Sequence, residues 1–357
     1  MGNNIKMKTI SCAIDWESVR NNKETFFLSG MNAFVCKLID RWVIRSAAAR
    51  MPRAAGVDSG YEHARRLLES PDFFAEDTPA PEVSFTGGRN FQFPSSVITT
   101  SPENNVVQGR ISRCGKHWRK RPAVVLLHGW NDRIGYRYRF DWLARRFNRR
   151  GINSIAFELP YHFHRRPKQG PVRNFISEDL GRTMEAVHQG LADINSMVQW
   201  LLDQGCPRVS LMGYSLGAWL AGLVACHNPK LASVVLVTPV SRMDRTIDEL
   251  AFCAPIRDVL LKRPMDLSPL NLHSHKPKLS RGFVLLVEAE HDVFVPEDST
   301  AELWQAWGNP ELWSLSHGHI TILASSSMMK RATKWVSLRM KAPEAVIEGV
   351  RPDQVIG

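Results

Sequence analysis

The most informative chemical signal in the chain is a serine between glycines. Residues 213–217 read Gly-Tyr-Ser-Leu-Gly, and they follow an apolar run at 209–212 and precede a helical pattern. A tight turn between a strand and a helix raises such a serine above the edge of a sheet, and the glycines leave room where a Cβ would clash. The pattern therefore predicts Ser215 as a nucleophile, with a serine in an ordinary glycine turn as the alternative.

A serine hydroxyl is a weak nucleophile until a base takes its proton, and a third group usually orients that base. In one known chain order of such triads the acid follows the serine and the histidine comes last. We expect Asp292 to be the acid, because it stands beyond the apolar run 283–288 and shortly before a Val-Pro that leads into a helical pattern. Glu290 is the alternative carboxylate.

The base should follow the last strand, and two histidines stand there, His317 and His319. We expect His319 to be the general base and keep His317 as the alternative. A lone histidine is more often structural than catalytic. Three candidate groups in the order Ser215, Asp292, His319 nevertheless favour a catalytic triad over a chance arrangement.

Two backbone amides are candidates for holding the oxyanion that forms when a serine attacks a carbonyl. The amide of Leu216 lies at the positive end of the helix that follows the serine. The loop after the first buried strand begins His-Gly-Trp-Asn at residue 128, and the amide of Trp130 is the expected second donor. His128 and Tyr214 are expected near the substrate, although His128 is more typical of a structural histidine.

The chain from residue 122 alternates between strand and helix patterns. Residues 123–127 are a continuous apolar run, as expected for a strand buried on both faces of a parallel sheet. In the helix expected at 183–202, apolar residues recur every three or four positions. The alternation predicts an α/β fold with a mostly parallel sheet and helices on both faces. A β segment with a turn at Gly87-Gly88 is expected at 82–98. Further strands are expected at 106–113, 152–158, 208–213, 232–238, 282–288 and 312–315, and further helices at 61–68, 139–150, 216–226, 298–307 and 326–340.

Four segments in this order resemble the α/β-hydrolase superfamily: the His-Gly oxyanion segment at 128–129, the Gly-Tyr-Ser-Leu-Gly turn, the Asp292-x-x-Val-Pro region and Gly318-His319. The likeness covers roughly residues 80–340. Similar members are mostly esterases, lipases, dienelactone-type hydrolases and acyl peptidases, and none of them needs a cofactor for hydrolysis. The resemblance implies the α/β-hydrolase fold, no cofactor and the catalytic roles given above.

Three regions flank or interrupt the strand and helix pattern. Residues 1–80 are expected to form a helical appendage, whose basic amphipathic helix at about 31–50 packs on the main domain or lies on a membrane surface. Residues 81–341 are the expected catalytic domain. Within it, residues 242–280 form a mostly helical insertion, either a lid or a plain excursion, and residues 342–357 form a C-terminal tail.

Basic residues concentrate in one stretch, residues 133–173, where eleven Lys and Arg side chains face only Asp141 and Glu158. The last part of this stretch follows the strand expected at 152–158. In open parallel sheets, ligands bind beyond the carboxyl ends of the strands. We therefore expect Arg165 or Arg166 to border the active site and to favour esters that carry an anionic group.

The composition argues against several other classes of protein. Apolar residues make up 44% and charged residues 23% of the 357 residues, which is typical of a soluble globular protein. The net charge is +11, but the Arg-rich stretch does not show the aromatic interleaving of an RNA-binding motif. Six scattered cysteines without a C-x-x-C pair predict buried thiols, and the His162-x-His164 pattern is a weak metal signal. We expect a cytoplasmic protein without metal, cofactor, nucleic-acid partner or integral membrane segment.

These observations lead to one main hypothesis and two alternatives. The main hypothesis is a carboxylic ester hydrolase that works through an acyl-enzyme on Ser215. A peptidase or amidase with the same triad is the first alternative, because some peptidases of the superfamily share the Tyr214 that precedes the serine. A non-catalytic binding protein on a hydrolase scaffold is the second.

Overall fold

Short apolar segments form the centre of the sheet, as the sequence predicts. In the computed structural model, which describes residues 32–49, 60–75, 78–168, 174–296 and 298–341, nine strands form one sheet in the order β1-β2-β3-β5-β4-β6-β7-β8-β9. The strands are β1 (Ser84–Thr86), β2 (Asn90–Pro94), β3 (Val106–Ser112), β4 (Ala123–Leu127), β5 (Asn153–Phe157), β6 (Val209–Tyr214), β7 (Ser233–Val237), β8 (Val284–Ala289) and β9 (Glu311–Leu315).

Pairing in the sheet is parallel from β5 to β9 and antiparallel at the other edge. β4 pairs with β5 and β6 in parallel, whereas β3 joins β5 antiparallel. The β segment expected at 82–98, with a turn at the glycines at 87 and 88, forms two strands, β1 and β2, which pair as a hairpin around these glycines. Because parallel strands end at the same edge, the loops after β4, β6, β8 and β9 meet there.

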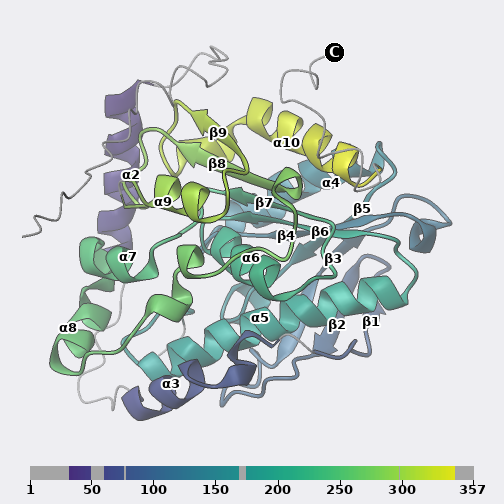
Figure 1. The fold of residues 1–357 in the computed structure, drawn as a ribbon. Helices are drawn as coiled ribbons and strands as arrows, with labels where there is room; N and C mark the ends of the chain where they lie inside the picture. Colours follow the sequence, from purple (N-terminus) through teal and green to yellow (C-terminus); the bar gives the residue numbers. More distant parts are fainter. Residues whose placement is uncertain (1–31, 50–59, 76–77, 169–173, 297, 342–357) are drawn as a thin grey trace, which may run out of the picture. The chain divides into compact units, whose positions relative to one another are not determined.

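Helices cover both faces of the sheet, and the side chains of β4 show why. Val125 and Leu127 point into a core that they share with α5 (Leu180–Asp203) and α6 (Leu216–His227). Val124 and Leu126 point to the other face and pack with side chains of α4 (Phe140–Asn148) and α10 (Ser326–Arg339). Figure 1 shows these two layers of helices with the sheet between them. The arrangement is the α/β-hydrolase fold, and the expectation of this fold is confirmed.

The two N-terminal helices that the structure describes belong to the same compact unit as the sheet. Helix α3 (Tyr61–Leu68) packs on α5, where His63 Nε2 lies 2.8 Å from Glu185 Oε1. Helix α2 (Ala33–Ala48) packs on the short turn Ala251–Cys253 and leaves an apolar ridge outside, with Phe34 71% and Trp42 67% exposed. Residues 1–30 and the expected tail at 342–357 lie outside the described residues.

The insertion at 242–280 is helical, as expected. It contains α7 (Met243–Glu249), α8 (Ala254–Lys262) and several short 3-10 turns, and helix α9 (Ser299–Ala306) follows after β8. Among the described residues, no helix has the length and apolar character needed to cross a bilayer. The five cysteines in the described segments form no disulfide with one another.

Candidate active site

Ser215 occupies a strained turn between β6 and α6. Its φ is 50° and its ψ is −115°, which lies in a region that side chains other than glycine rarely adopt. A Cβ on Gly213 would lie 2.2 Å from the carbonyl oxygen of Gly217, and a Cβ on Gly217 would lie 2.5 Å from the carbonyl oxygen of Leu127. Only glycine fits at these two positions, so the expected glycine-flanked turn has a steric cause.

His319 lies between Ser215 and Asp292 and is almost fully buried. Its Nε2 is 2.9 Å from the Oγ of Ser215, and its Nδ1 is 2.7 Å from Oδ2 of Asp292. Ser215 follows β6, Asp292 lies in the loop after β8, and His319 lies in the loop after β9. The structure thus brings together the three side chains that the sequence nominated.

The Asp292 carboxylate is held by its own loop. Its Oδ1 accepts hydrogen bonds from the amides of Phe294 at 2.7 Å and Val295 at 3.0 Å, which leaves Oδ2 for His319. The Phe294 ring stacks on the imidazole of His319, with ring centroids 4.5 Å apart. One oxygen is therefore fixed by backbone and the other orients the histidine.

The two alternatives that the sequence left open lie apart from these contacts. Glu290 is exposed, and its Oε1 accepts a hydrogen bond from the Ser314 hydroxyl at 3.3 Å. His317 uses its backbone carbonyl to accept a hydrogen bond from the amide of His291 at 2.9 Å. The ring that contacts both the Ser215 hydroxyl and the Asp292 carboxylate is that of His319.

Charges around His319 make its ring more basic than usual. Burial lowers the pKa of the imidazole, but the negative charges of Asp292 and Asp40 outweigh it, so the pKa of His319 is raised. A base of raised pKa has a stronger drive to take the serine proton. For His317 the direction is opposite, because burial lowers its pKa.

The loop after β4 lies directly against the serine. A Cβ on Gly129 would come within 3.5 Å of the Ser215 Cβ, and Trp130 and Leu216 both line the pocket that opens at Ser215. The backbone segments that carry the two expected oxyanion donors, Trp130 and Leu216, therefore both lie close to Ser215.

His128 supports this loop and does not reach the pocket. It is fully buried, with Nδ1 2.8 Å from the carbonyl oxygen of Gly129 and Nε2 accepting the amide of Leu159 at 3.1 Å. These partners require a proton on Nδ1, and burial lowers the pKa of the ring well below its usual value, so His128 is neutral. It connects the loops after β4 and β5, a structural role.

Tyr214 and Arg165 also have interior positions, which corrects the expectation that they contact substrate. The Tyr214 side chain is fully buried against Phe140, with the Arg139 guanidinium 4.6 Å from the ring centroid. Arg165 is fully buried and donates to Asp193 at 2.7 Å. Neither side chain borders the pocket.

The other hydrogen bonds of Arg165 are made to backbone carbonyl oxygens in the interior. It donates to the carbonyl oxygen of Asn104 at 3.1 and 2.8 Å and to that of Glu158 at 3.1 Å. Sequence position alone suggested the opposite, because the charge pattern does not reveal a buried carboxylate on α5. Arg166 is half-buried and hydrogen-bonded to the Asn131 side chain, next to Trp130.

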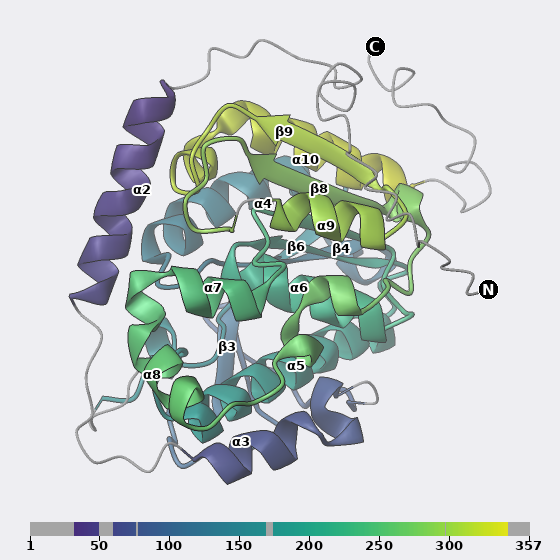
Figure 2. The same ribbon diagram turned by 60° about the vertical axis from the view of Figure 1, so that its left-hand side comes forward.

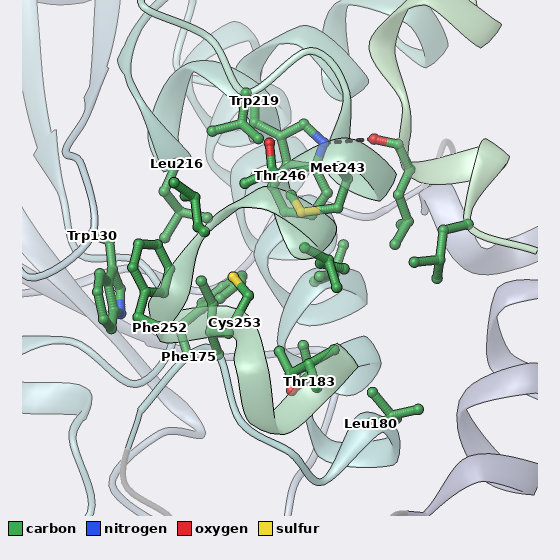
Figure 3. Close-up of a pocket in the computed structure, with 18 of the residues that line it drawn as sticks. Trp130, Phe175, Leu180, Thr183, Leu216, Trp219, Met243, Thr246, Phe252 and Cys253 are labelled. Carbon is green, nitrogen blue, oxygen red and sulfur yellow. Dashed lines mark hydrogen bonds between the residues drawn. The ribbon is translucent and has the colours of Figure 1, made fainter. Parts of the chain in front are cut away.

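The pocket at Ser215 is apolar and enclosed by two elements. The sequence suggested a place near the site for only one of them, the insertion, with a lid as one of its two interpretations. One wall is the start of α5, and the other is the insertion at 242–280. Figure 3 shows Trp130, Leu216 and Phe252 at one end and Leu180 and Thr183 at the other. The space measures about 940 Å³ with the open solvent at its mouth included. The apolar periodicity of α5 signalled only burial, so sequence reasoning missed the pocket.

A hydrogen bond joins the insertion to the helix that follows the serine. The Trp219 indole donates to the carbonyl oxygen of Leu270 at 2.7 Å, drawn as a dashed line in Figure 3. Phe252 of the insertion stacks on Trp130, with centroids 5.1 Å apart. The insertion is thus built into the pocket wall.

Comparison with known proteins supports this reading of the fold. A protein of Mycobacterium tuberculosis of uncharacterised function is 28% identical over 282 residues, covering 71% of this chain and 67% of the relative. A monoglyceride lipase homolog of monkeypox virus is 28% identical over 134 residues, 36% of this chain and 44% of that protein. The acetyl xylan esterase of Paenibacillus sp. R4 superposes with a TM-score of 0.52 at 11% identity, over 80% of this chain and 98% of that one, and shows the shared fold alone.

The model of the alpha/beta hydrolase family matches residues 124–351, a segment that includes Ser215, Asp292 and His319. This match covers more than half of the chain and supports a hydrolase activity. The protein belongs to the alpha/beta hydrolase family.

Proposed function

We propose that this protein is a serine hydrolase that cleaves carboxylic esters with an apolar acyl chain through an acyl-enzyme intermediate. The observation that carries the proposal is the hydrogen-bonded series Ser215, His319, Asp292 at the mouth of an apolar pocket. The series supplies an activated nucleophile, and the pocket supplies a place for the part of the substrate that water solvates poorly.

The proposed reaction has two halves. The Ser215 Oγ attacks the ester carbonyl while His319 Nε2 takes the hydroxyl proton, and the resulting imidazolium is stabilised by Asp292. The amides of Leu216 and Trp130 hold the oxyanion. The C–O bond to the alcohol breaks, and His319 returns the proton to the leaving oxygen.

In the second half, water replaces the alcohol. His319 takes a proton from water, the resulting hydroxide attacks the acyl-enzyme, and collapse of the second oxyanion releases the carboxylic acid and restores the Ser215 hydroxyl. No cofactor enters either half. The same histidine acts as base and acid in turn, which requires the fixed ring that Asp292 and Phe294 provide.

The pocket favours an apolar acyl chain over the anionic group expected from the sequence. None of the described residues that line it is charged, so burying a charge there without a partner would be costly. Of the two arginines expected to favour an anionic substrate, Arg165 is committed to Asp193, and Arg166 is not among the residues that line the pocket. Similarity to a monoglyceride lipase homolog over 36% of the chain is in keeping with a lipid-like ester.

The test is hydrolysis of chromogenic esters from acetyl to long-chain acyl, together with one aminoacyl anilide. We expect turnover that rises with acyl length and is lost in Ser215→Ala. Ser84→Ala, on the exposed edge strand β1, is the matched control and should behave like the wild type.

Two other outcomes would favour a different function. Anilide cleavage at rates near those of the esters would favour a peptidase or amidase. If no substrate is turned over and a fluorophosphonate does not label Ser215, the ester hydrolase proposal fails and a binding protein on this scaffold becomes the better reading.

A further inference from the structure

A carboxylate from the N-terminal helix reaches the loop that carries His319. Asp40 lies on α2 and is fully buried. Its Oδ2 accepts the backbone amide of His319 at 2.8 Å, and its Oδ1 accepts the amide of Ile320 at 3.0 Å. Helix α2 is far from β9 in the chain, yet Asp40 caps this loop after β9; Figure 2 shows the helix in purple.

The fit between α2 and this loop is close on either side of Asp40. A Cβ on Gly318 would lie 2.9 Å from Asp40 Oδ2 and 3.1 Å from the Cβ of Cys36, so only glycine allows the helix this near. Cys36 Sγ lies 3.5 Å from the hydroxyl of Thr321. The Thr321 hydroxyl in turn accepts the amide of Gly318 at 2.8 Å. One turn of α2 therefore contacts each residue from Gly318 to Thr321.

Burying a carboxylate costs free energy, so a carboxylate at this contact calls for a reason beyond attaching the helix. Burial raises the pKa of Asp40, while the amides of Ile320 and His319 and the charge of His319 oppose that rise. A neutral asparagine would offer one oxygen to two amides and turn its NH₂ group toward the other donor. A carboxylate satisfies both amides and adds a negative charge near the imidazole.

We propose that Asp40 is a positioning residue for His319, and that α2 thereby forms part of the catalytic apparatus of this protein. The inference rests on the proposed function. Asp40 holds the backbone on which the His319 ring is mounted, while Asp292 holds the ring itself. The charged groups that face His319 are Asp292, from the loop after β8, and Asp40, from α2. Both stabilise the imidazolium that forms when Ser215 gives up its proton.

The test compares Asp40→Asn with Asp193→Asn, a matched change of a second fully buried aspartate that lies in the Arg165 ion pair. We expect Asp40→Asn to lower kcat by about ten- to a hundred-fold, because small displacements of a catalytic group have effects of that size. KM should change little. The acid limb of kcat/KM should move to lower pH, because a negative charge that raises the pKa of His319 is removed.

Asp193→Asn is expected to lower thermal stability and to leave the position of the acid limb unchanged. Asp40→Glu, which restores the charge with a longer side chain, should recover the acid limb and part of kcat. A purely structural role for Asp40 would instead lower the amount of folded enzyme in Asp40→Asn and leave the pH profile of the folded fraction unmoved.

A readout that needs no turnover is amide hydrogen exchange in the segment 316–323. We expect Asp40→Asn to speed exchange there, with little change in a β4 peptide. Gly318→Ala, which presses a Cβ against Asp40 from the loop side, should have the same local effect, and the double variant should add little to it. This second variant keeps the test available if Asp40→Asn does not fold.

The outcomes separate this inference from the proposed function. If the wild type turns over esters and Asp40→Asn leaves kcat, the pH profile and amide exchange unchanged, the inference is overturned and the ester hydrolase proposal stands. Absence of turnover in the wild type would overturn the proposed function, and unchanged exchange in the segment 316–323 would then overturn the Asp40 contact as well.

Discussion

The side of Ser215 that faces His319 is a series of specific polar contacts, whereas the side that faces α7 and α8 is an apolar wall. On the first side, hydrogen bonds join Asp40 to the backbone of His319 and join the His319 ring to Asp292 and Ser215. On the second side, residues such as Met243 and Phe252 contribute volume and no hydrogen bonds toward the pocket. Hydrogen bonds depend on direction and protonation, while apolar contacts depend mainly on area and shape.

This difference makes the two sides separable by experiment. Changes on the polar side should lower kcat for every ester, because they act on proton transfer, which all substrates share. Changes on the apolar side should reorder the esters by acyl length, because they act on the part of the substrate that varies.

The largest effect is expected for Asp292→Asn. An asparagine can present its NH₂ to Nδ1 and so favour the tautomer in which Nε2 carries the proton and cannot act as base. We expect kcat to fall by about 10⁴-fold for all acyl lengths. Steady-state kinetics across the ester panel measures this effect. Glu290→Gln is the control and should retain wild-type rates; a comparable loss there would move the acid to Glu290.

The next effect concerns stability and tests whether the buried ion pair of Arg165 and Asp193 belongs to the substrate site. Arg165→Met leaves the Asp193 carboxylate buried without its partner, and such a loss typically costs about 3–5 kcal/mol of folding free energy. Urea denaturation measures it. Relative rates on neutral and carboxylate-bearing esters should stay as in the wild type. A selective loss on anionic esters would return Arg165 to the substrate site and contradict the division into two sides.

A smaller effect is expected from filling the pocket. Leu180→Trp adds bulk at the end that lies away from Trp130 and Leu216 in Figure 3. Long-chain esters should lose about 10- to 200-fold in kcat/KM, the range for a chain segment that a pocket no longer accepts. Acetyl esters should be unaffected. Leu202→Trp, on the same helix outside the pocket, is the control, and an equal loss for all lengths would place the acyl chain elsewhere.

The smallest effect is the pH dependence of the wild type. The base must be neutral, so kcat/KM should be full above the pKa of His319 and fall about tenfold per pH unit below it. Because Asp292 and Asp40 raise this pKa, the midpoint should lie above about 6.5, the usual value for histidine. A midpoint below that value would favour His317, whose pKa burial lowers.

Much of the fold and the residues of the candidate triad could be predicted because their signals are local. Continuous apolar runs such as 123–127 can be satisfied only in a sheet covered on both faces, and β4 is such a strand. The turn at Ser215 requires glycine on both sides for steric reasons that act within a few residues. The ends of parallel strands then bring Asp292 and His319 to the same edge, whatever the length of chain between them.

Other features depend on partners that are distant in the chain. Arg165 reads as a surface cation until Asp193, 28 positions away, is seen to bury it. In the sequence, Asp40 only interrupts an apolar stretch; its partner amide at His319 lies 279 positions away. The apolar pocket likewise needs α5 and the insertion at 242–280 to face each other across Ser215.

The sequence by itself therefore determined the order of the strands and helices along the chain and nominated Ser215, Asp292 and His319, because periodicity and tight turns act locally. Only the tertiary structure decided which charged side chains lie inside, which face the pocket and which helix holds the histidine loop. Burial and pairing arise from chain segments that meet in space, and residue type alone does not encode which segments meet.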